Sequence, residues 1–301
     1  MAERDVRIYE VGPRDGLQNE AQPISTEAKL HFIALLADAG LREIEATSFV
    51  SPTAVPQLAD AADLMERLDR RPGVRYPVLV PNRRGMDRAL AAGADAVCVF
   101  TAASEQFTER NIGMTIAGSL EAFRPVIDGA RSGGLWSRGY VSTAFGCPYQ
   151  GVVGVAAVVG VAKELIGLGV DEVSIGDTIG VAVPSDVRRV VVALLDAGIP
   201  ATRLAMHFHD TRGTALANVT AALELGIRTF DASTSGTGGC PYAPGAAGNL
   251  ATEDLVYLLD REGLSHGASL GGVLAAAAFI SETLSRPLTS KVGQAGGWDY
   301  H

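Results

Sequence analysis

The chain has 301 residues, of which 47% are hydrophobic and only 6% aromatic, a length and composition that suit one soluble α/β barrel and give no sign of disorder. Its 34 acidic side chains outnumber the 25 basic ones, for a net charge of −9, which argues against nucleic acid or an anionic membrane as the main partner. The three cysteines lie far apart, so they do not form a disulfide framework and favour a reducing compartment.

Strand-like runs alternate with amphipathic, helix-like runs along the chain. The strand-like runs cover residues 6–15, 43–50, 75–82, 96–104, 138–146, 171–180, 203–210 and 228–236. Several of the runs between them end in a glycine that suits a helix C-cap, and 266–288 is typical of an added C-terminal helix. Eight strand–helix units favour a (β/α)8 TIM barrel over an open doubly wound sheet.

The organisation predicted from this pattern is a single catalytic domain over residues 1–301. Its barrel spans about 6–262 and its helical extension about 263–301. Strand-like residues begin at about Val6, and no apolar run is long enough to span a bilayer. We therefore expect no signal or transit peptide, no membrane span and a cytoplasmic location.

Polar residues collect where the predicted strands end, which is where barrels of this class build their active sites. The first strand ends in Arg14 and Asp15, where a dinucleotide-binding fold would need a glycine-rich turn. The seventh ends in the sequence HFHD, and side chains alternate along a strand, so His207 and His209 point the same way. An isolated pair of this kind can merely satisfy backbone groups, so the rest of the rim decides its role.

A divalent cation is the ligand that this rim predicts. Asp15, His207, His209 and Asn249 supply two nitrogens and two oxygens, leaving Mg²⁺ or Mn²⁺ with positions for a bidentate substrate and a water. Zinc is the alternative, although the set contains no thiolate. Asp15 alone could instead form a salt bridge with a barrel arginine.

Arg14 and the cysteines have separate interpretations. The guanidinium of Arg14 can stabilise an enolate oxygen or hold a carboxylate, and it can also pair with Glu45.

Cys240 lies in a loop with five glycines between residues 236 and 248, typical of a lid that brings a proton donor to the substrate. Cys98 is predicted to be inert core, and the role of Cys147 stays open.

Seven segments together resemble the 3-hydroxy-3-methylglutaryl-CoA lyases, which belong to the metal-dependent lyase barrels with an Arg-Asp pair on strand one. They are EVGPRDGLQNE, TSFVSP, VPNRRG, GYVSTAFGCPYQG, GDTIGV, MHFHDTRGTALANV and GGCPYAPGAAGNLATEDLVYLL. The likeness runs from about residue 6 to about 292. The Arg-Asp and His-x-His motifs indicate the superfamily, and the cysteine loop narrows it to the lyases.

The resemblance implies cleavage of 3-hydroxy-3-methylglutaryl-CoA to acetyl-CoA and acetoacetate, with a divalent cation bound. Each role that it implies falls on a matching position of this chain: Asp15, His207, His209 and Asn249 as metal ligands, Arg14 for the enolate, His207 for proton transfer, Cys240 as the loop acid, Glu45 as a catalytic acidic residue, and Gln18 and Asp177 as substrate-binding residues. The chemistry of the residues adds Asp15 as a second catalytic candidate for accepting the hydroxyl proton. It further implies an acyl-CoA substrate, a homodimer and a place in leucine degradation. Two departures, the missing lysine after Glu20 and Pro244 in the loop, bear on acyl specificity and loop kinetics.

The sequence leaves three alternatives for the function. One is a lyase for a related 3-hydroxyacyl-CoA such as citramalyl-CoA, and the second is a Claisen-type synthase, a class that generally carries further C-terminal regions. The third is a CoA- or metal-binding barrel without turnover, which would not need the acid in the loop. The preferred metal, the acyl group and the final proton donor, Cys240 or a water, are not determined by the sequence.

Overall fold

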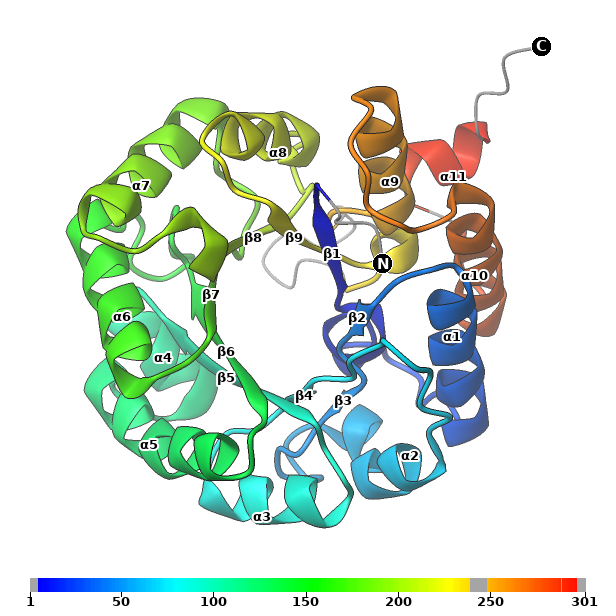
Figure 1. The fold of residues 1–301 in the computed structure, drawn as a ribbon, viewed down its shortest axis with the longest axis horizontal. Coiled ribbons are helices and arrows are strands. Elements are labelled where there is room, and N and C mark those ends of the chain that lie inside the picture. The colour runs from blue at the N-terminus through cyan, green and yellow to red at the C-terminus, as the bar shows by residue number, and fades with distance from the viewer. Residues whose placement is uncertain (1–4, 239–247, 288, 297–301) are drawn as a thin grey trace.

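One parallel sheet closes on itself to form the centre of the molecule (Figure 1). The computed structural model describes residues 5–238, 248–287 and 289–296. The strands are β1 (Arg7–Glu10), β2 (Glu43–Ile44), β3 (Thr47–Ser48), β4 (Val78–Leu79), β5 (Ala96–Ala102), β6 (Trp136–Ser142), β7 (Glu172–Asp177), β8 (Leu204–Phe208) and β9 (Thr229–Ala232). In the sheet they follow the order β2-β1-β9-β8-β7-β6-β5-β4-β3.

The second predicted strand is split in two, and this split lies where the barrel closes. β2 pairs with β1, and β3, on the same run of chain, pairs with β4. Between them the backbone amide of Glu45 donates to the carbonyl of Glu10 at 2.8 Å. The predicted TIM barrel is confirmed, with eight strand positions around the ring.

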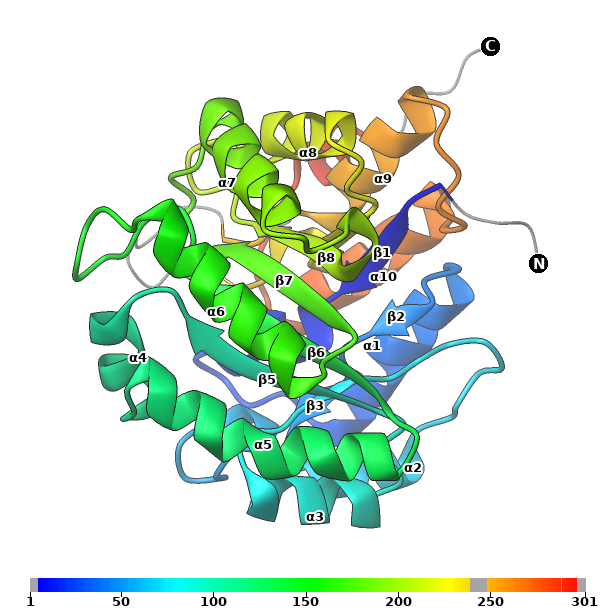
Figure 2. The ribbon, with the colours of Figure 1, turned by 60° about the vertical axis from the view of Figure 1, so that its left-hand side comes forward.

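Helices surround the sheet (Figures 1 and 2). They are α1 (Thr26–Asp38), α2 (Ala61–Arg67), α3 (Arg83–Ala91), α4 (Glu105–Ile112), α5 (Ile116–Ser132), α6 (Val155–Leu168), α7 (Pro184–Asp196), α8 (Ala215–Glu224), α9 (Thr252–Arg261), α10 (Leu270–Thr283) and α11 (Lys291–Ala295). The predicted C-terminal helix is α10, which packs on α1 with Phe279 edge-on to His31. Among the described residues, no helix is both long and apolar enough to cross a membrane.

The first strand is shorter than the sequence predicts, Arg7–Glu10 instead of 6–15. β1 ends at Glu10, and Gly12–Gly16 form one π-helical turn, η1, so Arg14 and Asp15 lie on a turn and not on a strand. Pro13 has no amide hydrogen for a sheet ladder, which explains why strand pairing stops before it. The turn places two consecutive side chains at the rim, whereas a strand would send them to opposite faces.

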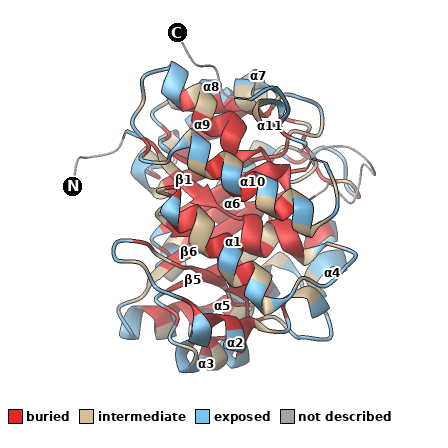
Figure 3. Cartoon of the chain, turned by 90° about the vertical axis from the view of Figure 1, so that its right-hand side faces the viewer, coloured by how far each residue is buried: buried red, intermediate tan, exposed pale blue. Residues whose placement is uncertain are grey.

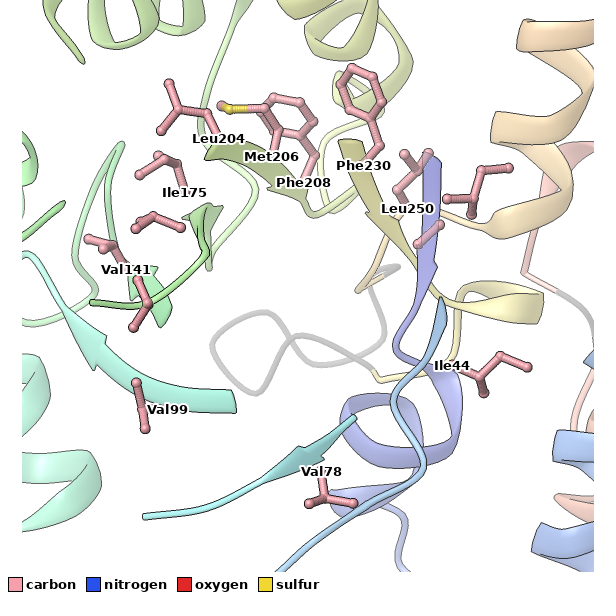
Figure 4. Close-up of a cluster of buried hydrophobic side chains, with 14 of the residues drawn as sticks. Ile44, Val78, Val99, Val141, Ile175, Leu204, Met206, Phe208, Phe230 and Leu250 are labelled. Atoms are coloured by element: carbon pink, nitrogen blue, oxygen red, sulfur yellow. The ribbon is translucent and has the colours of Figure 1, made fainter. Parts of the chain in front are cut away.

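The apolar core lies between the sheet and the helices (Figure 3). Figure 4 shows Met206, Phe208 and Phe230 among its buried side chains. Because Met206 and Phe208 flank His207 along β8, the histidine faces the barrel interior while its neighbours face the helices.

The barrel interior contains charged side chains. Arg138 of β6 is fully buried, with Nε 3.1 Å from Glu172 Oε1 and Nη2 2.6 Å from Asp231 Oδ1. Nearer the strand starts, Arg7 pairs with Glu172 and with Glu43. The Arg138 side chain is fully buried, whereas that of Arg7 is 38% exposed, and each charge has an opposite charge within reach.

The C-terminal segment is attached to the rim through α9. The carboxylate of Glu253 accepts a hydrogen bond from the backbone amide of Ser235 at 3.0 Å and another from the hydroxyl of Ser290 at 2.5 Å. Thr289 also donates to the carbonyl of Ser235 at 2.6 Å. Ser235 has a φ of 63°, in the left-handed region that a serine rarely adopts. The hydrogen bonds of its amide to Glu253 and of its carbonyl to Thr289 hold it in this conformation.

We expect Glu253→Gln to become more stable relative to the wild type as the pH rises. Burial raises the pKa of Glu253 from 4.5 to about 7. Between these values the folded protein binds more protons than the unfolded chain, so the wild-type free energy of unfolding falls as pH increases. From about pH 5 to about pH 8, the variant should gain about 2 kcal/mol over the wild type in denaturant titrations. Exposed Glu66→Gln is the control, and a pH-independent difference at Glu253 contradicts the prediction.

Candidate active site

Three potential metal ligands meet at the carboxyl ends of the strands. Asp15, His207 and His209 each offer an atom, and these atoms lie within 4.8 Å of one another. In the sheet β9 lies between β1 and β8, so the turn after β1 and the end of β8 both reach this point. The side chains of Asp15 and His207 are 21% and 14% exposed, while His209 is buried. The predicted grouping is therefore present, with access from solvent.

Asn249 joins the same cluster. Its Nδ2 donates to Asp15 Oδ2 at 2.8 Å and to the carbonyl of Thr237 at 2.9 Å, and its backbone forms a bridge with His209. Within the described chain, Asn249 Oδ1 and His209 Nδ1 are buried and have no hydrogen-bond partner. Buried polar atoms of this kind are costly unless a ligand engages them. A carboxylate, two imidazoles and an amide oxygen fit a divalent cation.

The electrostatics favour cation binding at His209 and Asp15 and, without a cation, favour protonation of His207. Burial, and then the nearby His207, lowers the pKa of His209 to about 3, so its ring is neutral. Burial acts to raise the pKa of Asp15, but Arg14 and His207 outweigh it and the pKa is lowered overall. Burial also acts to lower the pKa of His207, where the hydrogen bond and charge of Asp231 prevail and raise it.

Arg14 is fixed between two carboxylates. Its Nη1 lies 2.9 Å from Asp15 Oδ1, its Nη2 lies 2.9 Å from Glu45 Oε2, and its guanidinium carbon lies 5.5 Å from the centre of the Tyr140 ring. The hydroxyl of Tyr140 donates to the same Glu45 oxygen at 2.9 Å. The ion pair with Glu45 considered from the sequence is therefore present beside the contact with Asp15.

Three polar side-chain atoms, two of them in this pair and one two residues after Glu45, have no hydrogen-bond partner in the described part of the chain. They are Arg14 Nε, Glu45 Oε1 and Thr47 Oγ1, all buried. Among the described residues, one donor, one acceptor and one hydroxyl are thus without a partner, and the donor belongs to Arg14, which contacts the predicted ligand Asp15. Such groups can bind the oxygens of a polar substrate that replaces water there.

Two predicted substrate-binding residues have different surroundings. Gln18 donates to Asp15 Oδ1 at 3.3 Å, at the edge of the cluster. Asp177 is buried, and its two oxygens accept the backbone amides of Val181 and Ala182, each at 3.0 Å. The carboxylate therefore shapes the loop after β7, and its contact with substrate stays a prediction.

The cysteines are placed as follows. Cys240 lies outside the described residues, so its role as the loop acid stays a prediction. Cys98 is buried in β5 beside the Tyr9 hydroxyl at 3.1 Å, which confirms it as core. Cys147 is also buried, and its sulfur accepts a hydrogen bond from Ser104 Oγ at 3.1 Å.

Sequence reasoning missed four buried residues that support the site: Glu10, Arg138, Tyr140 and Asp231. Glu10 accepts hydrogen bonds from the amides of Gly12 and Thr234, both at 2.9 Å, and so ties η1 to the turn after β9. A signal was present, because a charged residue in the middle of an apolar strand must face a polar interior or a partner. Asp231 in TFDAS is such a residue.

We expect Gly238→Ala to weaken divalent-cation binding by about tenfold or more, in line with the loss of a group that supports a ligand. Gly238 has a φ of +87°, and an added Cβ would lie 2.6 Å from Asn249 Nδ2 and 3.2 Å from the Asp15 carbonyl. Calorimetric titration of Mn²⁺ measures the effect. The control is Gly263→Ala, which has a φ of +72° and no atom within 4 Å of the added Cβ. Equal cation affinity in the two variants would contradict the prediction.

Comparisons with known proteins agree with this geometry. The model of the HMGL-like family matches residues 5–280. The mitochondrial hydroxymethylglutaryl-CoA lyase of Bos taurus is 50% identical over 292 residues, which cover 97% of this chain and 90% of that protein. The cytoplasmic 3-hydroxy-3-methylglutaryl-CoA lyase of Homo sapiens is 49% identical over 290 residues, covering 96% of this chain and 78% of that protein.

Solved structures of similar proteins share the whole fold. Hydroxymethylglutaryl-CoA lyase from Pseudomonas aeruginosa is 47% identical, with a TM-score of 0.94 and 97% of each chain covered. An HMG-CoA lyase from Acinetobacter baumannii, solved in complex with coenzyme A and 3-methylmalate, is 36% identical, with a TM-score of 0.93 and coverage of 100% of this chain and 99% of that one.

Proposed function

The chain belongs to the HMGL-like family, and from this premise we infer that it is a carbon–carbon lyase that cleaves 3-hydroxy-3-methylglutaryl-CoA to acetyl-CoA and acetoacetate. The observation that carries the inference is the meeting of Asp15, His207 and His209 beside Arg14, in a chain half identical to a hydroxymethylglutaryl-CoA lyase over nearly its whole length. A related 3-hydroxyacyl-CoA such as citramalyl-CoA is the second candidate substrate.

The chemistry assigns a role to each residue at the rim. Cleavage next to a tertiary alcohol needs a base for the hydroxyl proton and stabilisation of the thioester enolate that forms. A divalent cation held by Asp15, His207, His209 and Asn249 would lower the pKa of that hydroxyl, and we propose Mg²⁺ or Mn²⁺ because half of the ligand atoms are hard oxygens.

Proton transfer and charge stabilisation then rest on the side chains of the protein. We propose His207 or Asp15 as the group that accepts the hydroxyl proton, Glu45 as the carboxylate that holds Arg14, and Gln18 and Asp177 as residues near the substrate. Arg14 Nε is buried and has no partner among the described residues, so this donor is available to the enolate oxygen. The donor is fixed before the reaction, which limits the reorganisation needed as charge develops.

Turnover of the purified protein tests the inference. After chelation and return of Mg²⁺ or Mn²⁺, we expect acetyl-CoA and acetoacetate in equal amounts from 3-hydroxy-3-methylglutaryl-CoA, and little product before the cation is returned. Faster cleavage of citramalyl-CoA would reassign the substrate. Tight CoA binding without any product would favour a binding barrel, and net condensation of an acyl-CoA with an oxo acid would favour a synthase.

We expect Cys240→Ser to lose most of the catalytic rate while keeping the fold and cation affinity, because a hydroxyl is a far weaker acid than a thiol. Rapid-quench and steady-state assays measure the loss. The control is Cys98→Ser, a change at the buried thiol of β5, which should affect stability more than the chemical step. Near-normal turnover of Cys240→Ser would make a water the better candidate for the final proton donor.

The biological setting is a further proposal. We propose a cytoplasmic location, which is supported by the reducing environment that the cysteines indicate and by a cytoplasmic human relative. From the family resemblance we also propose a homodimer and a role in leucine degradation. Other relatives are mitochondrial. Light scattering on the purified protein determines the oligomeric state, and fractionation of the source cells determines the location.

A further inference from the structure

The two histidines of the cluster have different surroundings. His207 Nδ1 lies 3.2 Å from Asp231 Oδ2, and the two residues are direct register partners on β8 and β9. His209 Nδ1 is buried without a hydrogen-bond partner in the described chain. Only one ring of the pair is therefore held by a carboxylate.

Asp231 is itself fixed from two sides. Its Oδ1 accepts a hydrogen bond from Arg138 Nη2 at 2.6 Å, and its Oδ2 accepts one from Ser174 Oγ at 2.9 Å. Arg138 stands on β6, which is separated from β9 by two strands, so its side chain reaches across the barrel interior. The guanidinium lies 3.9 Å from the centre of the Tyr9 ring. These contacts leave the carboxylate little freedom to rotate.

We propose that Asp231, held by Arg138, is a positioning residue that keeps the proton of neutral His207 on Nδ1 and leaves Nε2 as the nitrogen for a cation or a substrate proton. Arg138 can only donate, so the carboxylate must accept on that side. The oxygen facing His207 accepts as well, which favours a protonated Nδ1. A carboxylate behind a ligating imidazole fixes the ring and raises its basicity.

A purely structural role is the competing explanation. Asp231 also neutralises Arg138, together with Glu172, and loss of one partner of a buried ion pair is destabilising in any case. A fall in stability therefore does not distinguish the two roles. The tautomer of His207 distinguishes them. If Asp231 only neutralised the charge of Arg138, it would not matter which ring nitrogen of His207 carries the proton.

The variant Asp231→Asn separates the positioning role of Asp231 from a purely structural role. Arg138 can only donate, so the introduced amide must turn its oxygen to Arg138 and its NH₂ group to His207. His207 Nδ1 must then accept, and its proton moves to Nε2. Ser174→Ala is the matched control, since it removes one hydrogen bond from Asp231 but keeps the carboxylate.

The measurement is nuclear magnetic resonance of protein labelled with ¹⁵N-histidine, without cation or substrate and at an alkaline pH where the ring of His207 is neutral. His207 is assigned by the loss of its signals in His207→Gln. We expect the Nδ1–H tautomer in the wild type and in Ser174→Ala, and the Nε2–H tautomer in Asp231→Asn. Calorimetry should show Mn²⁺ affinity about 10 to 100-fold weaker in Asp231→Asn and nearly unchanged in Ser174→Ala.

The outcomes that overturn the proposal are distinct from those that overturn the proposed function. An Nε2–H tautomer of His207 in the wild type rejects the proposal without any variant. An unchanged tautomer and unchanged Mn²⁺ affinity in Asp231→Asn, with only a lower melting temperature, would leave Asp231 as a counter-charge to Arg138. The proposal rests on the proposed metal site for its role in catalysis, but the tautomer is measured without turnover, so an inactive protein still gives an answer.

Discussion

Arg14→Lys is expected to lower kcat about 1000-fold while KM changes much less, because the enolate charge that Arg14 stabilises exists only as the bond breaks. The guanidinium contacts Asp15 and Glu45 through separate nitrogens and still has Nε without a partner among the described residues. A lysine ammonium is a single charged centre and cannot keep both carboxylates and supply that third donor in the same geometry.

Steady-state kinetics with saturating cation measure this effect. The control is Arg124→Lys on the outside of α5, where the side chain is 56% exposed and pairs with Glu121, and its kcat should equal that of the wild type. Circular dichroism should be unchanged in the Arg14 variant, and the saturating cation offsets any loss of cation affinity that follows from the altered contact with Asp15. A variant that mainly raises KM would instead assign Arg14 to binding of the substrate carboxylate.

The second large effect is expected from His209→Ala, which should weaken divalent-cation binding by about 100-fold or more and abolish turnover at ordinary cation concentrations. Removal of a ligand costs more than the 10 to 100-fold typical of residues that only support a ligand. His209 is suited to the role because its ring is neutral, with a pKa of about 3, and its Nδ1 has no partner among the described residues.

Calorimetry of Mn²⁺ and of Mg²⁺ measures the loss directly, and added cation should restore part of the activity. His31→Ala is the control, since His31 lies on α1 against Phe279 and makes no contribution to the rim. Unchanged cation affinity in His209→Ala would remove this residue from the ligand set and leave Asp15, His207 and Asn249 as the set to test.

Much of this arrangement could be predicted from the sequence because it depends on local periodicity. Alternation along β8 places His207 and His209 on the same side, and the repeated strand–helix pattern indicates a barrel, which brings strand ends together at one rim. Asp15 and Asn249 could be added for the same reason, although 234 positions separate them. The fold class and the grouping of the metal ligands can therefore be predicted from sequence patterns alone, before any interatomic distance is known.

The remaining features depend on contacts that no local pattern encodes. The hydrogen bond between Asp231 and Arg138 joins non-adjacent strands across the barrel interior, and nothing in either strand indicates its partner. The π-helical turn that carries Arg14 and Asp15 replaces an expected strand end, because Pro13 interrupts pairing. Both are products of tertiary packing.

The pairing of β1 with β9 sets an order of events during synthesis. Arg7 emerges from the ribosome long before Thr229, its partner across the sheet, which lies 222 positions later in the chain. Until that segment arrives, β1 and β8 each present an unpaired edge that can associate with other chains and that a chaperone would have to shield. A chain released before residue 229 would contain Arg14, Asp15 and His207 but no closed ring to bring them together. Divalent cation should therefore protect the full-length chain against proteolysis and give no protection to such a fragment, because a ligand stabilises only the state that binds it.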